Sequence, residues 1–361
     1  MKKKKLTFVI SDLEIGGAQR VLVCLANYFL NKGFNIKILV FKFSNKKIFN
    51  LSKNIKIKNL SVYGESKNIF QKIISNINRI IKLRIEIKKN QSNVIISFLT
   101  TSNILTLISA IGLKKKIIVN ERNDITKKKL NYSWKLLRII FYRFAKKIIV
   151  NTPNIKKKIY FFSSKKIIFI PNPTTFTFSS KKIKKQKIIL SIARLTYQKN
   201  IEILIKSFSK SIALKKKWKL VIIGEGEEKK KLLKLAKKIN VFKSIIFMGV
   251  IKKIDIWYKK AGIFILPSRY EGMPNVIIEA MQSKTAIIGS NIPGIRYFIK
   301  NRSNGVIFKN NNENSLIKMI NLLINNSDLR KKLAKNGKKS ISKYNKSNNF
   351  FKIWERQLKK I

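Results

Sequence analysis

The sequence contains no histidine, one cysteine and only 16 acidic residues among its 361. Without histidine there is no imidazole general base, which excludes Ser-His-Asp and Cys-His catalysis and histidine metal sites. The single cysteine, Cys24, excludes a disulfide within the chain and is typical of a reducing cytoplasm. The aspartates lie far apart, at positions 12, 124, 255 and 328, so no Asp-x-Asp metal clamp exists.

Basic residues dominate the charged ones, with 80 Lys and Arg against 16 Asp and Glu and a formal net charge of +64. Such a charge suggests a nucleic acid or an anionic membrane as partner. However, the lysines are spread through every segment together with Ile, Asn and Phe, whose codons are all rich in A and T. Compositional bias therefore competes with selection for an anionic partner, and no recognised nucleic-acid module is present.

One uncharged run, residues 94–113, is long enough to span a bilayer. Polar residues at 100–103 interrupt its middle, so we expect a buried strand, a polar turn and a helix capped by Ser102 or Asn103. The apolar run at residues 6–11 is short and predicts a first strand rather than a signal peptide. We expect a cytoplasmic protein, with peripheral contact at the inner face of the cytoplasmic membrane left open.

Short apolar runs alternate with longer helical patterns along the chain. Strand-like runs occur at residues 6–11, 35–41, 93–98, 116–120, 147–151, 166–170, 187–193, 218–224, 244–249, 262–267, 285–290 and 305–308. Uninterrupted apolar strands that alternate with helices predict parallel sheets covered on both faces, so each half of the chain is expected to be a doubly wound α/β domain.

Composition also predicts the domain boundaries, because residues 171–186 hold two prolines and a Ser/Thr cluster. We expect a Rossmann-like N-terminal domain at 1–175, a linker at 176–186, a second Rossmann-like domain at 187–345 and a last helix at 346–361. Two domains joined in this way leave a central cleft. Ligands of parallel sheets bind beyond the carboxyl ends of the strands.

Three loops that follow predicted strands suit anionic or flat ligands. Gly16 and Gly17 precede a helix and would bring backbone N–H groups to an anion, although a simple tight turn is the other interpretation. Arg194 and Lys199 suit phosphate oxygens, and Arg is scarce beside Lys in this chain. A third loop, 224–226, has two glycines around Glu225, where a nucleobase or an ordinary turn would fit equally.

The stretch "SRYEGMPNVIIEAM", residues 268–281, places two glutamates eight positions apart in a chain that is poor in acid. Glu271 is expected in a loop, and Glu279 about one turn into a helix that Pro274 and Asn275 begin. A carboxylate can accept both hydroxyls of a ribose or hold a reacting sugar, so both glutamates are candidates to face one ligand. Surface or capping glutamates are the alternative.

Together these loops resemble glycosyltransferase family 4, retaining enzymes of the GT-B fold. The resemblance rests on "GGAQRV", "IPNP", "ARLTYQKN", "GEGEE", "SRYEGMPNVIIEAM" and "NIPG", in this order along most of the chain. It implies two Rossmann-like domains facing a central cleft and a retaining transfer of sugar from a nucleotide-sugar, usually a UDP-sugar. The acceptor would be a glycan or a polyprenyl- or lipid-linked glycan in cell-surface polysaccharide biosynthesis. No metal and no cofactor is implied, since the nucleotide-sugar is a substrate.

The resemblance also implies roles for individual residues. Glu271 would bind the transferred sugar, and Arg194 and Lys199 would hold the diphosphate. The donor-binding candidates are Gly16, Gly17, Gly224, Glu225, Gly226, Gly272, Met273, Pro274, Asn275 and Glu279, the last for the ribose. The acceptor-side candidates, from "VNERNDIT" at 119–126, are Asn120, Glu121, Arg122 and Asn123. The final helix would pack on the N-terminal domain.

The sequence departs from the family pattern at two points. Some members have a histidine near the donor sugar, and this chain has none. Tyr297 stands where members often have Glu, which changes acceptor handling or only local packing.

Two segments, 68–89 and 130–147, combine basic and apolar residues. In the second, we expect Trp134, Leu137, Phe141 and Phe144 on one face, with Lys135, Arg138 and Arg143 away from it. Such helices would lie on an anionic membrane or pack on their own sheet. The alternatives to a transferase are an isomerase or phosphorylase of similar fold, an inactive homologue, and a basic peripheral membrane or nucleic-acid-binding protein without transferase activity.

Overall fold

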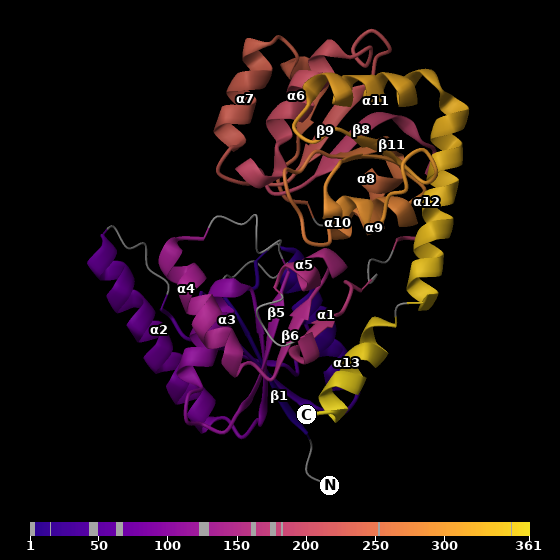
Figure 1. Cartoon of the computed structure of the whole chain (residues 1–361). Helices are drawn as coiled ribbons and strands as arrows, with labels where there is room; N and C mark the ends of the chain where they lie inside the picture. Colours follow the sequence, from indigo (N-terminus) through magenta and orange to yellow (C-terminus); the bar gives the residue numbers. More distant parts are fainter. Residues whose placement is uncertain are drawn as a thin grey trace. The chain divides into compact units, whose positions relative to one another are not determined.

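The computed structural model describes residues 4–14, 16–42, 50–62, 68–122, 130–159, 164–173, 178–181, 183–251, 253–347 and 349–361. Asn123, one of the predicted acceptor-side residues, lies outside them. The chain divides into two compact units, which we call the N-terminal unit (Met1–Pro173 with Phe350–Ile361) and the C-terminal unit (Thr174–Asn349). Each unit contains one parallel sheet flanked by helices (Figure 1).

The N-terminal unit is built on a seven-stranded parallel sheet in the order β3-β2-β1-β4-β5-β6-β7. Its strands are β1 Lys5–Ile10, β2 Asn35–Val40, β3 Lys56–Asn59, β4 Val94–Phe98, β5 Lys116–Glu121, β6 Lys147–Val150 and β7 Ile167–Phe169. Its helices are α1 Gly17–Asn31, α2 Ile69–Lys89, α3 Thr100–Ser109, α4 Tyr132–Phe141, α5 Pro153–Lys158 and α13 Phe350–Lys359, with a short 3-10 turn η1 Tyr142–Phe144 after α4.

Both faces of this sheet are covered, which is why its inner strands such as β1 and β4 are mostly apolar, whereas the edge strand β3 alternates exposed lysines with half-buried residues. Successive side chains of a strand point to opposite faces. In β1, Phe8 and Ile10 join one buried cluster, while Val9 joins the cluster on the other side. The first cluster also contains Phe350 and Trp354 of α13, and Trp354 is fully buried.

Helix α13 is fastened to α1 by polar and aromatic contacts as well. The hydroxyl of Tyr28 donates to Glu355 Oε1 at 2.8 Å. The rings of Tyr28 and Phe351 stack with centroids 4.1 Å apart. The last helix of the chain is therefore part of the core of the N-terminal unit.

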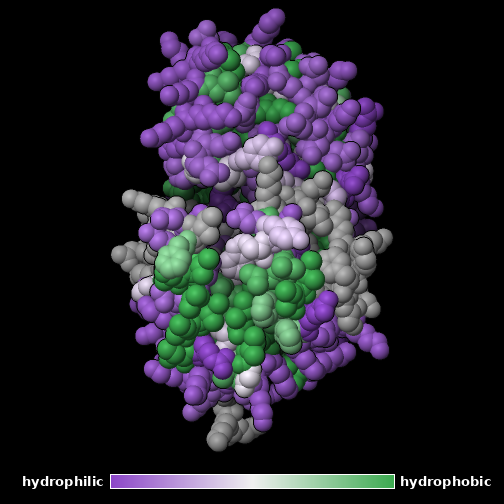
Figure 2. All heavy atoms as spheres, turned by 60° about the vertical axis from the view of Figure 1, so that its left-hand side comes forward, coloured by the Kyte–Doolittle hydropathy of each residue, from purple (hydrophilic) through white to green (hydrophobic). Residues whose placement is uncertain are grey.

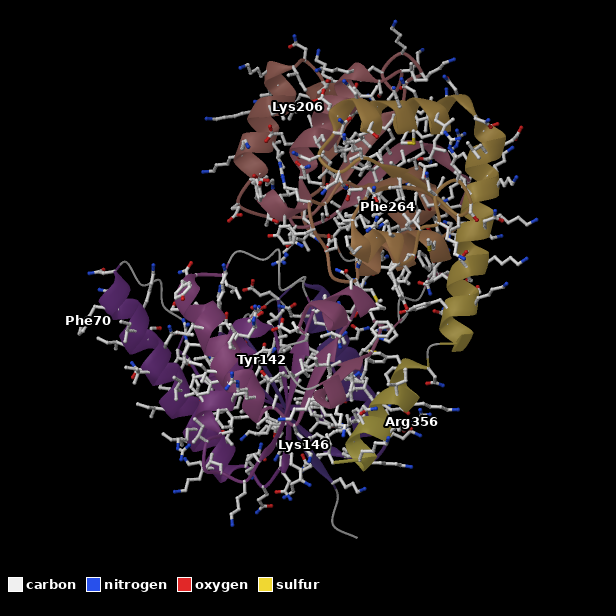
Figure 3. The ribbon with its side chains drawn as sticks, in the orientation of Figure 1. Phe70, Tyr142, Lys146, Lys206, Phe264 and Arg356 are labelled. Atoms are coloured by element: carbon white, nitrogen blue, oxygen red, sulfur yellow. The ribbon has the colours of Figure 1, made fainter. Side chains whose placement is uncertain are left out.

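The C-terminal unit has a six-stranded parallel sheet in the order β10-β9-β8-β11-β12-β13. Its strands are β8 Gln186–Ile192, β9 Lys219–Ile223, β10 Ile245–Phe247, β11 Ala261–Leu266, β12 Ala286–Ser290 and β13 Val306–Phe308. Its helices are α6 Ile201–Lys210, α7 Lys229–Lys238, α8 Asp255–Lys260, α9 Asn275–Gln282, α10 Pro293–Arg296, α11 Glu313–Asn325 and α12 Ser327–Ser347, with the 3-10 turn η3 Tyr197–Lys199 before α6. Phe264 of the central strand β11 lies within the fold (Figure 3). The predicted class, two doubly wound parallel α/β sheets, is confirmed.

The uncharged run at 94–113 forms strand β4 and helix α3, as expected. The predicted capping residues are wrong, because α3 begins at Thr100 with Leu99 in the cap position. Ser102 and Asn103 lie inside the helix and are buried. Among the described residues, no helix is long and apolar enough to cross a membrane.

Helix α4 decides between the two interpretations left open by the sequence. Trp134, Leu137 and Phe141, expected with Phe144 on one face, pack against the core of the N-terminal unit, which is the alternative in which the helix packs on its own sheet. Arg138, expected to point away from the apolar side, is buried. This side of the helix is therefore used for folding.

Candidate active site

The predicted site residues of the C-terminal unit lie in loops that leave the sheet at one edge. The first loop follows β8, the second follows β9, and the third follows β11 and runs into α9. Because all strands are parallel, their carboxyl ends share this edge, where α/β sheets bind ligands.

An ion pair joins the first and third loops. Lys199 Nζ donates to Glu271 Oε1, and the side chains keep only 15% and 7% of their exposed surface. Ser268 Oγ donates to the same carboxylate oxygen at 2.7 Å. Gln198 Nε2 lies 3.4 Å from Oε2 and donates at 2.9 Å to the Tyr270 carbonyl. The Glu271 carboxylate is therefore held in one orientation before any ligand arrives.

Arg269 of the third loop also contacts the first loop. Its guanidinium lies 4.0 Å from the centroid of the Tyr197 ring and donates to the Tyr197 carbonyl at 2.6 Å. Its backbone N–H donates to the Gln198 carbonyl at 2.9 Å. These contacts align the residues on either side of the Lys199–Glu271 pair.

Arg194 is exposed at the start of the first loop, close enough to act electrostatically on Tyr270. Burial, followed by the charge of Glu271, raises the pKa of Tyr270, and Arg194 and Arg269 act in the opposite direction. Arg194 thus lies within the electrostatic reach of the third loop. Its exposed guanidinium can rotate toward an anion without breaking a buried contact.

The glycines of the second loop serve close packing against the first. Gly224 has φ +142°, and a Cβ there would overlap the Ala193 carbonyl oxygen. A Cβ at Gly226 would lie 2.7 Å from Leu195 N. Leu195 N donates to the Glu225 carbonyl at 2.9 Å, so the two loops form one backbone layer. The side chain of Glu225 is exposed and pairs with Lys229 at 2.6 Å. That a nucleobase lies on this layer stays a prediction.

Helix α10, which follows β12, packs closely against the other side of the third loop. A Cβ at Gly294 would overlap the Gly272 carbonyl oxygen and lie 2.8 Å from that of Glu271. Met273 and Pro274 are buried, and Tyr344 OH of α12 lies 3.6 Å from Met273 Sδ. Helix α9 then begins at Asn275 without a side-chain cap from Pro274.

Glu279 lies on α9 and is buried, with 2% of its surface exposed. Tyr258 of α8 donates its hydroxyl to Glu279 Oε2 at 2.7 Å. The Tyr258 ring is itself fully buried, against Phe178 and Phe264. The two glutamates of the motif therefore have different partners, Lys199 for Glu271 and Tyr258 for Glu279.

In the N-terminal unit, Gly16 and Gly17 lie at the start of α1. The preceding loop is ordered by Asp12, which accepts from the Glu14 backbone N–H at 3.0 Å and from Gln19 Nε2 at 2.9 Å. A Cβ at Gly16 would overlap the Gln19 side chain. Because those atoms are the far end of a flexible side chain, they could shift to make room.

The acceptor-side candidates Asn120, Glu121 and Arg122 are buried at the carboxyl end of β5. Glu121 accepts from the hydroxyls of Thr100, at 3.0 Å, and of Tyr142. Figure 3 shows Tyr142 inside the unit, and burial, followed by the charge of Glu121, raises its pKa.

Arg122 Nη1 donates to Asn172 Oδ1 at 2.8 Å. Within the described part of the chain, the side-chain amide of Asn120 has no hydrogen-bond partner, although the residue is fully buried. A buried amide without a partner is rare in folded proteins, which keeps Asn120 a candidate for contact with a ligand.

Residues 173–340 match the family described as "Glycosyl transferases group 1". Over 341 residues the chain is 30% identical to a GalNAc-alpha-(1->4)-GalNAc-alpha-(1->3)-diNAcBac-PP-undecaprenol alpha-1,4-N-acetyl-D-galactosaminyltransferase of Campylobacter jejuni, and the match covers 92% of each protein. The chain belongs to this glycosyltransferase family. Membership confirms the predicted enzyme class, a glycosyltransferase.

Another relative of this glycosyltransferase is an N-acetylgalactosamine-N,N'-diacetylbacillosaminyl-diphospho-undecaprenol 4-alpha-N-acetylgalactosaminyltransferase, also of Campylobacter jejuni. It is 27% identical over 95% of this chain and 96% of its own length. Among solved structures, sucrose-phosphate synthase of Thermosynechococcus elongatus superposes with a TM-score of 0.84 at 15% identity, over 99% of both chains. Anabaena Alr3699/HepE in complex with UDP-glucose superposes with a TM-score of 0.83 at 14% identity, over 99% of this chain and all of the other. These likenesses confirm the GT-B fold.

Sequence reasoning missed several residues that shape the glycosyltransferase site. Ser268 and Gln198 lie inside motifs that the sequence singled out, but only the folded loops show that both contact Glu271. Tyr258 lies in "IDIWYKK", where nothing indicated a contact with Glu279.

Tyr297, the departure from the family pattern, packs edge-on against Phe298 and Tyr344, and burial raises its pKa. Among the described residues, no group of three or more Cys, Asp or Glu side chains could hold a metal ion.

Proposed function

We propose that this glycosyltransferase transfers a sugar from a nucleotide-sugar, with UDP-sugars the first candidates, to a polyprenyl- or lipid-linked glycan with retention of configuration. Two relatives in Campylobacter act, by their names, on undecaprenol-linked glycans. A structure of the same fold is a complex with UDP-glucose. Both support the proposed donor and acceptor classes.

The observation that carries the proposal is the Lys199–Glu271 pair at the carboxyl edge of the sheet. An ammonium has three donors. Glu271 accepts one of them, which leaves donors of the same ammonium for diphosphate oxygens. In turn, Glu271 is fixed by Ser268 so that its carboxylate can accept from the hydroxyls of a sugar. One pair of residues would thus bind both sides of the bond that breaks.

In the proposed reaction the bond between C1 of the sugar and the diphosphate oxygen breaks, and a bond from C1 to the acceptor oxygen forms on the same face. The acceptor hydroxyl proton passes to the leaving diphosphate oxygen, so the reaction needs no imidazole base. Negative charge grows on the diphosphate, where Lys199 and Arg194 stabilise it. The N–H groups at the start of α9, together with the helix dipole, add to this stabilisation.

Glu279 is proposed to accept the ribose hydroxyls, with Tyr258 holding one carboxylate oxygen in place. The backbone of 272–275 would bind sugar and phosphate, and the layer at 224–226 would carry the base. In the N-terminal unit, Gly16 and Gly17 are proposed to contact the diphosphate. Asn120, with its unpartnered amide, is proposed to contact an acceptor hydroxyl.

The deciding experiment combines binding with turnover. Purified protein is titrated calorimetrically with UDP, GDP and ADP, and nucleotide-sugars of the preferred nucleotide are assayed with a membrane lipid extract as acceptor. We expect one nucleotide to be preferred and one of its sugars to be transferred with the anomeric configuration retained. Failure of all three nucleotides to bind, or an inverted product, would contradict the proposal.

A further inference from the structure

Helix α2 carries more apolar surface than its own core uses. Leu83 and Ile87 are buried in the core of the N-terminal unit. A second apolar row runs along the exposed side of the helix, formed by Phe70, Ile73, Ile74, Ile77, Ile81 and Ile85. Phe70 keeps 71% of its surface exposed, and Figure 3 shows it pointing away from the unit. Folding of the unit does not account for this second row.

Helix α4 repeats the arrangement. Its folding side is formed by Trp134, Leu137 and Phe141. On the outside lie Tyr132, Leu136, Ile139 and Ile140, and Phe144 follows in η1. Tyr132 is 82% exposed and Phe144 66%. Spacings of three and four residues place the outer residues on one side of the helix.

The two exposed rows belong to one surface, which we call the α2–α4 face. Helix α3 contacts both α2 and α4, so the three helices form one layer on the sheet (Figure 1). Figure 2 brings this side of the N-terminal unit forward and shows a broad green area there. Contiguous apolar areas of this kind mark interaction sites on soluble folds.

The charges around the α2–α4 face decide which partner fits it. Exposed lysines on α2 include Lys82, Lys88 and Lys89, and α4 and η1 add Lys135 and Arg143. Glu86 is the one acidic residue in the sequence of either helix, and Lys37 neutralises it at 2.8 Å. Apolar rows with basic residues around them fit an acidic bilayer surface, in which the helices lie in the interface plane. A second copy fits poorly, because each chain carries a net charge of +64.

We propose that the α2–α4 face docks on the surface of an acidic phospholipid bilayer. The aromatic residues at its ends, Phe70, Tyr132 and Phe144, enter the headgroup region, and the isoleucine rows between them reach the acyl boundary. The surrounding lysines contact lipid phosphates. This inference depends on the described surface alone and would hold for any donor or acceptor.

The test is vesicle flotation of the full chain with two matched double variants. Ile77→Asn/Ile81→Asn removes two exposed isoleucines from the α2–α4 face. Phe242→Asn/Ile246→Asn removes two similarly exposed apolar residues from the C-terminal unit. Both variants leave the net charge unchanged. Vesicles of phosphatidylcholine alone are compared with vesicles that also contain phosphatidylglycerol, and thermal unfolding verifies that each variant is folded.

We expect the wild type to float with phosphatidylglycerol vesicles and far less with phosphatidylcholine alone. The α2 variant should bind about tenfold more weakly, because two apolar anchors are lost, whereas the matched control should bind like the wild type. Equal flotation of both variants would mean that charge alone drives binding and would overturn the proposal. Sedimentation velocity without vesicles provides a second check. A wild-type dimer that the α2 substitutions dissociate, with no vesicle binding, would identify the face as an interface between copies and would also overturn it.

Discussion

Lys199 donates to Glu271 across two loops that follow different strands, β8 and β11. The pair joins the cation expected at the diphosphate to the carboxylate expected at the sugar. The pair also connects the first and third loops at the carboxyl ends of the strands. Removing it should therefore lower both turnover and the free energy of unfolding.

Lys199→Met should lower turnover by about 100–1000-fold, because one preorganised cation is lost where negative charge develops. It also leaves Glu271 without its counter-charge in a mostly buried site, which should lower the free energy of unfolding by about 3 kcal/mol. Steady-state kinetics and urea unfolding measure the two effects. Lys206→Met, which removes a half-exposed partner of Glu202 within α6, is the control and should change neither value much. Normal turnover in Lys199→Met would remove Lys199 from the mechanism.

Arg194→Ala should separate activity from stability. Arg194 is exposed, so its loss should leave the melting temperature almost unchanged while turnover falls about 100–1000-fold. Arg194→Lys keeps the charge but loses the planar fork, and should recover only part of the activity. The matched control is Arg356→Ala on the exposed side of α13. If Arg194→Ala and Arg356→Ala turn over equally fast, Arg194 has no role at the diphosphate.

Tyr258→Phe tests whether Tyr258 positions Glu279. The ring contacts with Phe178 and Phe264 remain, but the hydroxyl that donates to Glu279 is lost. We expect weaker nucleotide binding with a smaller change in kcat, and a loss of stability of about 1–3 kcal/mol. Tyr142→Phe makes the corresponding change at Glu121 in the N-terminal unit. It should leave nucleotide affinity unchanged, and a similar loss of affinity in both variants would contradict the specific role of Tyr258.

Gly294→Ala should displace the third loop, although Gly294 itself lies outside that loop. The added Cβ would overlap the Gly272 carbonyl oxygen, so backbone must move at the residue next to Glu271. Unfolding in urea should show a loss of about 2–3 kcal/mol, together with reduced turnover. For comparison, Gly337→Ala adds a Cβ inside α12 with its nearest contact at 3.3 Å and should change stability by less than about 1 kcal/mol. Equal stability of the two variants would show that the loop accommodates the overlap.

Sequence pattern was sufficient for the parallel sheets because the signal is repetitive. Most buried strands repeat a similar apolar run, as β1 and β5 do, and most are followed by a helix. The caps and helix faces were harder to predict. Ser102 has the chemistry of a cap but lies inside α3, and α4 is apolar on both sides, so periodicity could not say which side meets the core.

For a similar reason, only part of the site could be predicted from the sequence. Glu271, Lys199 and Glu279 stand out by residue type and by position after strands. Their partners do not stand out, because Tyr258 reaches Glu279 from 21 positions away and Gln198 reaches Glu271 from 73. Such pairs arise from strand order, which places β8 beside β11, and no local pattern encodes them.

The membership of α13 in the N-terminal unit has a consequence for synthesis. The ribosome makes residues 4–173 first, yet the pocket that receives Trp354 stays open until residues 350–361 emerge. The whole of 174–349 is translated in between and can fold independently during that time. Until then the nascent N-terminal sheet keeps an apolar surface uncovered, and truncation before Phe350 would leave that surface uncovered in the finished chain.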